Sequence, residues 1–361
     1  MSKNIPDMKK EEEIPYCIWH PHTADEPTYR ALAKKYPQMR YHVGRPCAVA
    51  GYTNLFHELD LLSDISIAEE ARDNNKLVIF DSIMSSPFKY AVMNDYTRSI
   101  NTDNPRVGNL NADTAVRSTL EIKQKYRSTP EPDDPSRPWP DHQWQYYFFK
   151  YGYHFNITED WCVDENETDL CKELPGDAQL LPLLYSPLPL DLPNIDKDLL
   201  VLTAAYYGDI DRYARLRRPH IKEPELSCIV RGIYHNTMFA KWWSNQPEAQ
   251  PEAHEWKHAI RCAITARFIM NNDLSRVTEE TPERDLPYLI YYPSLAQPST
   301  YEELVRRKPS MAPQVARASI IMDHQWLYDK LPVKPDQGLM REAKQALIHI
   351  TLLISKEELT S

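Results

Sequence analysis

The sequence predicts an all-α protein, an array of short helix pairs whose first and last parts are copies of one unit. Residues 14–72 and 286–344 align without a gap at a constant offset of 272, with 17 identities in 59 positions. Unrelated chains of average composition would share about four. The 361 residues include only eight glycines, too few for glycine-rich β-hairpins and phosphate loops. Thirty prolines favour many short elements with firm ends.

Composition divides the chain into four parts. We expect a disordered tail over 1–13, an N-terminal helical half over 14–127, a proline- and aromatic-rich loop and strap over 128–195, and a C-terminal helical half over 196–361. The tail has no apolar leader, and no apolar run approaches the ~18 residues of a membrane span. These features predict a cytoplasmic protein without a membrane partner, and a nuclear location is also compatible with them.

Each copy of the duplicated unit opens with an extended stretch that ends at a proline. A threonine then suits a helix N-terminus, Thr28 in the first copy and Thr300 in the second, and the helix should end at the proline nine residues later. Two shorter helices are expected next in the first copy, over 43–50 and 54–59, joined at Gly51.

The segment Cys47–Leu59 resembles the core of an ankyrin repeat, in which small residues, a glycine turn and a leucine recur at fixed spacing. Leu202–Leu216 is similar to the same core, and Ile67–Met84 more loosely. The Thr-Pro-Leu-His signature of the family is absent. The resemblance therefore implies a degenerate ankyrin-like α-solenoid, similar to uncharacterised ankyrin-like proteins of filamentous fungi.

An arginine followed by a small or compact residue recurs near the start of the expected helices. Its guanidinium can reach a carbonyl or carboxylate of the neighbouring unit and fix the stacking, which is the interpretation that we favour. The alternative is a row of arginines that faces a ligand. The residues are Arg45, Arg117, Arg231, Arg261 and Arg317.

A second short duplication supplies candidate ligand-binding residues, because 93–98 resembles 270–276. Amide, carboxylate and guanidinium groups this close together can bind a polar ligand. In the alternative interpretation, the Asn and Asp side chains cap helix ends and the arginines pair with the aspartates. The candidates are Asn94, Asp95, Arg98, Asn271, Asp273 and Arg276.

Aromatic residues of the strap, Trp144, Tyr147 and Trp161, could line the walls of a pocket for such a ligand. His20 and His22 suggest a metal site, but the sequence supplies no third ligand at a recognisable spacing. We therefore predict no metal and no cofactor.

The net charge of −10 disfavours nucleic acid as a partner. The sequence also contains no phosphate-binding or nucleophile motif, so it predicts no particular reaction. The favoured function is a non-catalytic scaffold that binds another protein, as stacked helical repeats commonly do. The alternative is a small-molecule-binding protein or enzyme, for example in a fungal biosynthetic pathway, with a pocket between the repeat halves and the strap.

Overall fold

The structure is a computed structural model that describes residues 4–112, 114, 180–195, 197–219, 221, 223–247 and 258–345. The aromatic candidates Trp144, Tyr147 and Trp161 lie outside these residues, as does Arg117. The chain divides into two compact units. Unit 1 holds the described residues up to 114 together with 180–199, and unit 2 holds the described residues from 200 onward.

The described residues are mainly helical, which confirms the predicted all-α class. None of the described helices is long and apolar enough to cross a membrane.

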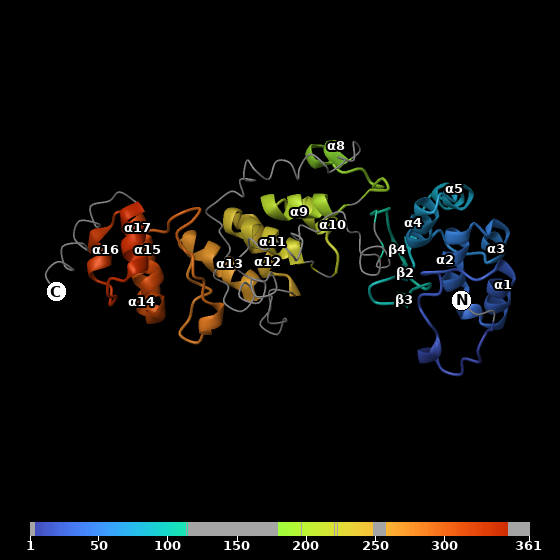
Figure 1. Ribbon diagram of the computed structural model, residues 1–361, viewed down its shortest axis with the longest axis horizontal. Coiled ribbons are helices and arrows are strands. Elements are labelled where there is room, and N and C mark those ends of the chain that lie inside the picture. Colours follow the sequence, from blue (N-terminus) through green and yellow to red (C-terminus); the bar gives the residue numbers. More distant parts are fainter. Residues whose placement is uncertain are drawn as a thin grey trace, which may run out of the picture. The chain divides into compact units, whose positions relative to one another are not determined.

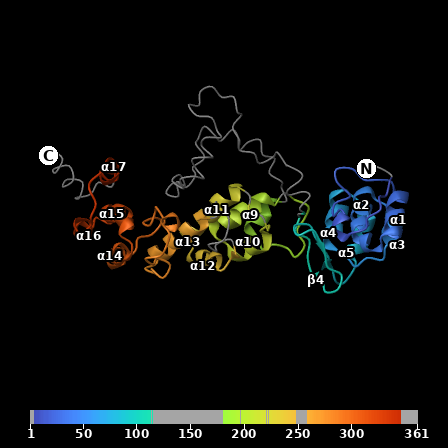
Figure 2. The same ribbon diagram turned by 90° about the horizontal axis from the view of Figure 1, so that it is seen from below.

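Unit 1 is built around α2, which packs against α1, α3 and α4, while α4 also packs against α5. In both views of the chain α2 lies between α1 and α4 (Figures 1 and 2). A left-handed residue follows the first helix of each pair: Gly51, with φ of 85°, directly after α2, and Asn75, with φ of 56°, two residues after the end of α4. The elements are η1 (Glu11–Glu13), α1 (Glu26–Lys35), η2 (Pro37–Met39), α2 (Arg40–Ala50), α3 (Thr53–Glu58), α4 (Ile65–Asp73), α5 (Leu77–Met84) and α8 (Leu180–Tyr185).

Two antiparallel ribbons in unit 1 were not predicted. β1 (Tyr90–Ala91) pairs with β4 (Arg106–Val107), and β2 (Met93–Asn94) pairs with β3 (Ser99–Ile100). The scarcity of glycine had argued against hairpins, but Arg98 takes the left-handed turn position itself, with φ of 56°.

Asp64 ties these ribbons to the helices. Its carboxylate caps α4 by accepting from the N–H of Ile67 at 2.9 Å, and it also accepts from the N–H groups of Val92 and Met93 at 2.8 and 3.0 Å. Farther along, the N–H of Leu192 donates to the carbonyl of Leu110 at 2.9 Å. The last part of the predicted strap therefore packs within unit 1.

Unit 2 continues the pattern of helix pairs. α11 packs against α12 and α13, and α15 packs against α14, α16 and α17. At Gly232 in α11, an added Cβ would lie 2.0 Å from the carbonyl oxygen of Ala205, so α9 and α11 approach too closely for a side chain there. The helices are α9 (Asp198–Tyr207, whose first two residues belong to unit 1), α10 (Ile210–Leu216), α11 (Glu223–His235), α12 (Thr237–Ser244), α13 (His258–Met270), η8 (Glu283–Asp285), α14 (Pro298–Arg307), η9 (Pro309–Met311), α15 (Ala312–Ile321), α16 (Gln325–Asp329) and α17 (Gln337–Gln345).

The two predicted copies have matching local structure. α14, η9 and α17 begin and end 272 residues after α1, η2 and α4, and α15 and α16 begin 272 residues after α2 and α3. In the first copy the hydroxyl of Tyr29 donates to the carbonyl of Ile18 at 2.7 Å and accepts from the N–H of Ala24 at 3.0 Å. In the second, the Tyr301 hydroxyl makes the same two bonds, at 2.8 and 3.1 Å.

The predicted threonine caps are wrong. α1 is capped by Asp25, which accepts from the N–H of Thr28 at 3.2 Å, and the Thr28 hydroxyl merely joins the same carboxylate. α14 starts at Pro298, and the Thr300 hydroxyl donates instead to Asn272 at 2.9 Å. A proline in the first turn favours helical geometry there, so both helices begin two residues before the threonine. Both end before the proline, as predicted.

Candidate functional site

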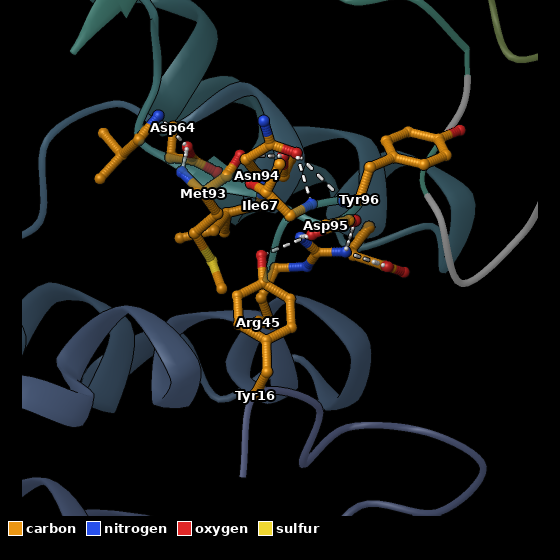
Figure 3. A network of polar contacts seen from close by, with 12 residues as sticks. Tyr16, Arg45, Asp64, Ile67, Met93, Asn94, Asp95 and Tyr96 are labelled. Carbon is orange, nitrogen blue, oxygen red and sulfur yellow. Dashed lines mark hydrogen bonds and ion pairs between the residues drawn. The ribbon is translucent and has the colours of Figure 1, made fainter. Parts of the chain in front are cut away.

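Arg45 is the centre of a buried ionic cluster in unit 1 (Figure 3). Its Nη1 and Nη2 atoms lie 2.9 and 3.0 Å from the two carboxylate oxygens of Asp95, and Nη2 lies 2.7 Å from Glu70. Arg45 comes from α2, Glu70 from α4 and Asp95 from the turn after β2. The cluster therefore joins two helices and a hairpin whose residues are far apart in the sequence.

The cluster is almost completely shielded from water. The side chain of Arg45 is 0% exposed, and those of Glu70 and Asp95 are each 5% exposed. Burial opposes the charged guanidinium, but the carboxylates of Asp95 and Glu70 outweigh this effect and raise the pKa of Arg45. The fork of two parallel bonds to Asp95 is the geometry in which an arginine best tolerates burial.

Aromatic side chains from the N-terminal segment cover the cluster. The Arg45 guanidinium lies 4.4 Å from the centre of the Trp19 ring, and the Tyr16 hydroxyl donates to Asp95 at 2.8 Å. The Tyr16 ring meets the rings of Trp19 and His42 edge-on, at 5.8 and 5.7 Å. Burial raises the pKa of Tyr16 and lowers the pKa of His42 to about 4, so both side chains are uncharged at neutral pH.

This arrangement suits a structural role better than catalysis. The carboxylates and the guanidinium bind one another, and they are almost completely buried. Among the described residues, three buried nitrogens around Tyr16 have no hydrogen-bond partner: Trp19 Nε1, His42 Nδ1 and Arg45 Nε. The cluster holds the N-terminal segment, α2, α4 and the β2–β3 hairpin together.

The three residues of the first candidate set, Asn94, Asp95 and Arg98, have different surroundings in the structure. Asp95 belongs to the buried cluster, where its partner is Arg45 and not the nearby Arg98. Asn94 caps the hairpin turn by accepting from the N–H groups of Tyr96 and Thr97 at 3.0 and 3.2 Å. Arg98 is exposed at the turn. The contacts of Asn94 follow the capping interpretation, and those of Asp95 serve packing.

The second set lies in unit 2, at the end of α13. The Asn271 amide donates to the Thr237 hydroxyl at 3.0 Å, and Asp273 accepts from the N–H of Ser275 at 2.8 Å. The hydrogen bonds with Ser275 lower the pKa of Asp273. Arg276 is half-buried over the Phe268 ring, at 5.6 Å from its centre, and burial lowers its pKa.

Sequence reasoning missed Tyr16, Trp19, His42 and Glu70 as members of the cluster. A usable signal was present for some of them, because Tyr16, Arg45 and Glu70 recur at the offset of 272 as Tyr288, Arg317 and Glu342. Two other arginines of the predicted row also behave as expected. Arg231 donates to the carbonyl of Tyr206 on α9 at 2.9 Å, and Arg261 to Asp285 at 2.9 Å.

The inter-helix turns of unit 2 form a second feature, which we name the turn ladder. The Asn236 amide donates to the carbonyl of Gly208 at 3.1 Å, Asn271 reaches Thr237, and Asn272 accepts from the N–H of Gln297 at 2.6 Å. Each turn is thereby bonded to the next. Tyr207 and Met238, on adjacent turns, are 68% and 65% exposed.

One protein family matches part of the chain. The sequence model of the family described as the YKP1 C-terminal domain matches residues 19–122, a range that includes every member of the buried cluster except Tyr16. No curated protein and no solved structure was found to match the chain.

Proposed function

We propose that this chain is a non-catalytic interaction protein, built from ankyrin-like helix pairs with one helical unit duplicated, and that it binds another protein. The observation that carries the proposal is the turn ladder of unit 2. Tyr207 and Met238 expose large apolar surface from adjacent turns that are bonded together. Tyrosine and methionine are enriched in protein interfaces, where rigid apolar side chains supply most of the binding energy.

The duplication is supported by what the two segments keep and by what they exchange. Tyr29 and Tyr301 make the same bonds. On the surface, Arg30 on α1 forms an ion pair with Glu58 of α3 at 2.8 Å, and Glu302 on α14 forms one with Lys330 at 2.9 Å. Positions 302 and 330 are positions 30 and 58 shifted by 272. The pair is therefore kept while its charges are exchanged, as expected of one ancestral unit that has diverged in two places.

The non-catalytic part of the proposal rests on the buried cluster. Arg45, Glu70 and Asp95 are buried charged groups beside Tyr16, and each is engaged with another member of the cluster. A general acid or base needs contact with a substrate, and these groups are closed off from solvent.

Photo-crosslinking of the full chain tests the proposal. A photoreactive amino acid at position 207 or 238 should capture one stoichiometric protein from native extract, and the Tyr207→Ser/Met238→Ser double variant should lose that protein. Val107 in unit 1 is 65% exposed and provides a matched control position. Capture at 107 equal to that at 207 and 238, or no capture above background, would contradict the proposal.

The alternative function, a small-molecule-binding protein or enzyme, is favoured by one observation. Arg276 Nε is buried and has no hydrogen-bond partner among the described residues, and Asp273 lies three residues away. A screen of small polar metabolites for thermal stabilisation of the full chain tests this function. Stabilisation that disappears in both Asp273→Ala and Arg276→Ala, with the fold retained, would support the small-molecule-binding function over the scaffold function.

A further inference from the structure

The two matching segments differ on the surface much more than in the core. The buried residues Tyr29 and Leu55 recur as Tyr301 and Leu327. Next to Leu327, however, Trp326 stands where the first segment has the exposed Asn54. Packing constrains the kept positions, whereas the exposed positions can differ without loss of the fold.

Trp326 is a large apolar side chain held in place on the surface. It is 53% exposed, the Lys330 ammonium lies 3.6 Å from the centre of its ring, and the His324 ring meets it edge-on at 6.0 Å. Lys330 is itself fixed by its ion pair with Glu302. A tryptophan ordered in this way loses little conformational freedom on binding, which is characteristic of an interface anchor.

Beside Trp326, residues of α14 and α16 border an open groove of about 520 Å³, which we name the α14–α16 groove. The volume is in the range of natural binding sites for small groups. Its apolar lining is Val305, Leu327 and Leu331, and its polar lining is Ser299, Glu302, Glu303, Arg306 and Lys330.

The charges of the groove select the kind of partner that fits it. Lys330 pairs with Glu302 at 2.9 Å and Arg306 with Glu303 at 2.6 Å, so the two acidic and two basic rim residues balance each other. A charged partner would have to compete with these pairs, whereas an uncharged apolar one would not. A second copy of this chain is disfavoured, because both copies carry a net charge of −10.

We infer that the α14–α16 groove and Trp326 bind a short uncharged segment of another protein, which packs large apolar side chains against the indole and over Val305 and Leu331. The inference rests on the proposed function, and it adds a second contact site and the chemistry of its partner. The first segment cannot offer this surface, because Asn54 replaces the anchor.

A random 12-residue peptide library displayed on phage serves as the probe, selected against the full chain. Enriched peptides should contain at least two large apolar residues and carry a net charge near zero. In fluorescence anisotropy with the synthetic peptides, Trp326→Asn should weaken binding at least tenfold. Ser299→Arg, which fills the groove from an exposed position, should do the same. Asn54→Trp, the matched control in the first segment, should leave the affinity unchanged.

Several results would overturn the inference. One is an enriched consensus that is strongly charged, and another is peptide binding that survives both Trp326→Asn and Ser299→Arg. A concentration-dependent dimer that Trp326→Asn abolishes would show that a second copy occupies the groove. Peptides lost only in Tyr207→Ser/Met238→Ser would refute the groove while leaving the proposed function intact. No enriched peptide together with no crosslinked protein would refute both.

Discussion

Arg45 shows how one buried charge can organise distant parts of a chain. Its side chain is 0% exposed, so the guanidinium needs carboxylates at close range, and these come from residues 25 and 50 positions later. Arg45 pairs with two carboxylates, those of Glu70 and Asp95, so the cluster carries one more negative than positive charge. The donor hydroxyl of Tyr16 partly offsets this excess at Asp95.

Removal of the Asp95 charge should destabilise unit 1 strongly. In Asp95→Asn, the buried Arg45 loses half of its ionic partners, and we expect a loss of roughly 3 kcal/mol in the free energy of unfolding. Hydrogen exchange of residues 40–84 in the full chain measures it. Arg98→Ala, three residues away and exposed, is the control and should change stability by less than about 0.5 kcal/mol. Similar effects of the two substitutions would show that the ionic cluster contributes no more than the exposed turn.

His42 should make unit 1 less stable in mild acid. Burial lowers its folded-state pKa from 6.5 to about 4, so between these values the unfolded chain binds a proton that the folded chain does not. Stability should therefore fall as the pH drops from 6.5 towards 4, by about 3 kcal/mol in total. In His42→Gln, which introduces the residue found at position 314, this part of the dependence should vanish. Unfolding of both proteins at pH 7 and pH 4.5 measures the effect, and parallel profiles would contradict it.

Among the elements, the approach of α9 to α11 depends on the absence of a side chain. The Ala205 carbonyl occupies the place where a Cβ of residue 232 would lie. The obstacle is backbone, so it cannot rotate away as the end of a side chain can.

Gly232→Ala should therefore destabilise unit 2 by about 2 kcal/mol or more, although alanine is the better helix former. Gly338→Ala in α17 is a matched control, because its added Cβ would meet side-chain ends and no backbone, with Arg317 Nη2 at 3.0 Å and Asp336 Oδ1 at 3.1 Å. Since these side-chain ends can shift, that variant should cost much less stability than Gly232→Ala. Thermal unfolding of both variants measures the difference, and an equal response would mean that α9 and α11 can separate without loss.

The elements also show how far sequence reasoning reached. Hydrophobic spacing and prolines located α1, α2, α3 and α14 to within a few residues, because these signals are local. The β1–β4 and β2–β3 ribbons could not be predicted from the sequence, because each strand has only two residues. In addition, the β2–β3 turn has Arg98 at a left-handed position where glycine is usual. Asp95 was found from a local motif, but its pairing with Arg45 depends on a contact across 50 residues. No spacing rule encodes such a contact.

At the scale of the whole molecule, residues 14–72 and 286–344 share one arrangement of helices but differ in their exposed residues. The shared arrangement consists of helices that start at matching positions and of the same hydrogen bonds made by Tyr29 and Tyr301. The surfaces differ at Trp326 and in the ion pair whose charges are exchanged between the two segments. Packing restricts which residues fit at the buried positions and leaves the exposed positions free to differ.

The exchanged pair can be tested by transplanting it. Arg30→Glu alone places a carboxylate beside Glu58 and should lower the urea midpoint of unit 1, since like charges then face each other. Adding Glu58→Lys reproduces the arrangement of Glu302 and Lys330 and should restore the midpoint. The difference between single and double variants should shrink in 1 M salt. A double variant as unstable as the single one would show that the two pairs are not equivalent.

The exchanged charges have a further consequence while the chain is still folding. Two similar helical segments in one polypeptide risk docking with each other's helices, a known hazard of tandem domains. Docking α1 onto α16 would set Arg30 against Lys330, and docking α14 onto α3 would set Glu302 against Glu58. Each wrong pairing meets repulsion where the right one meets attraction. We therefore expect these two surface salt bridges to favour docking of each segment onto its own helices.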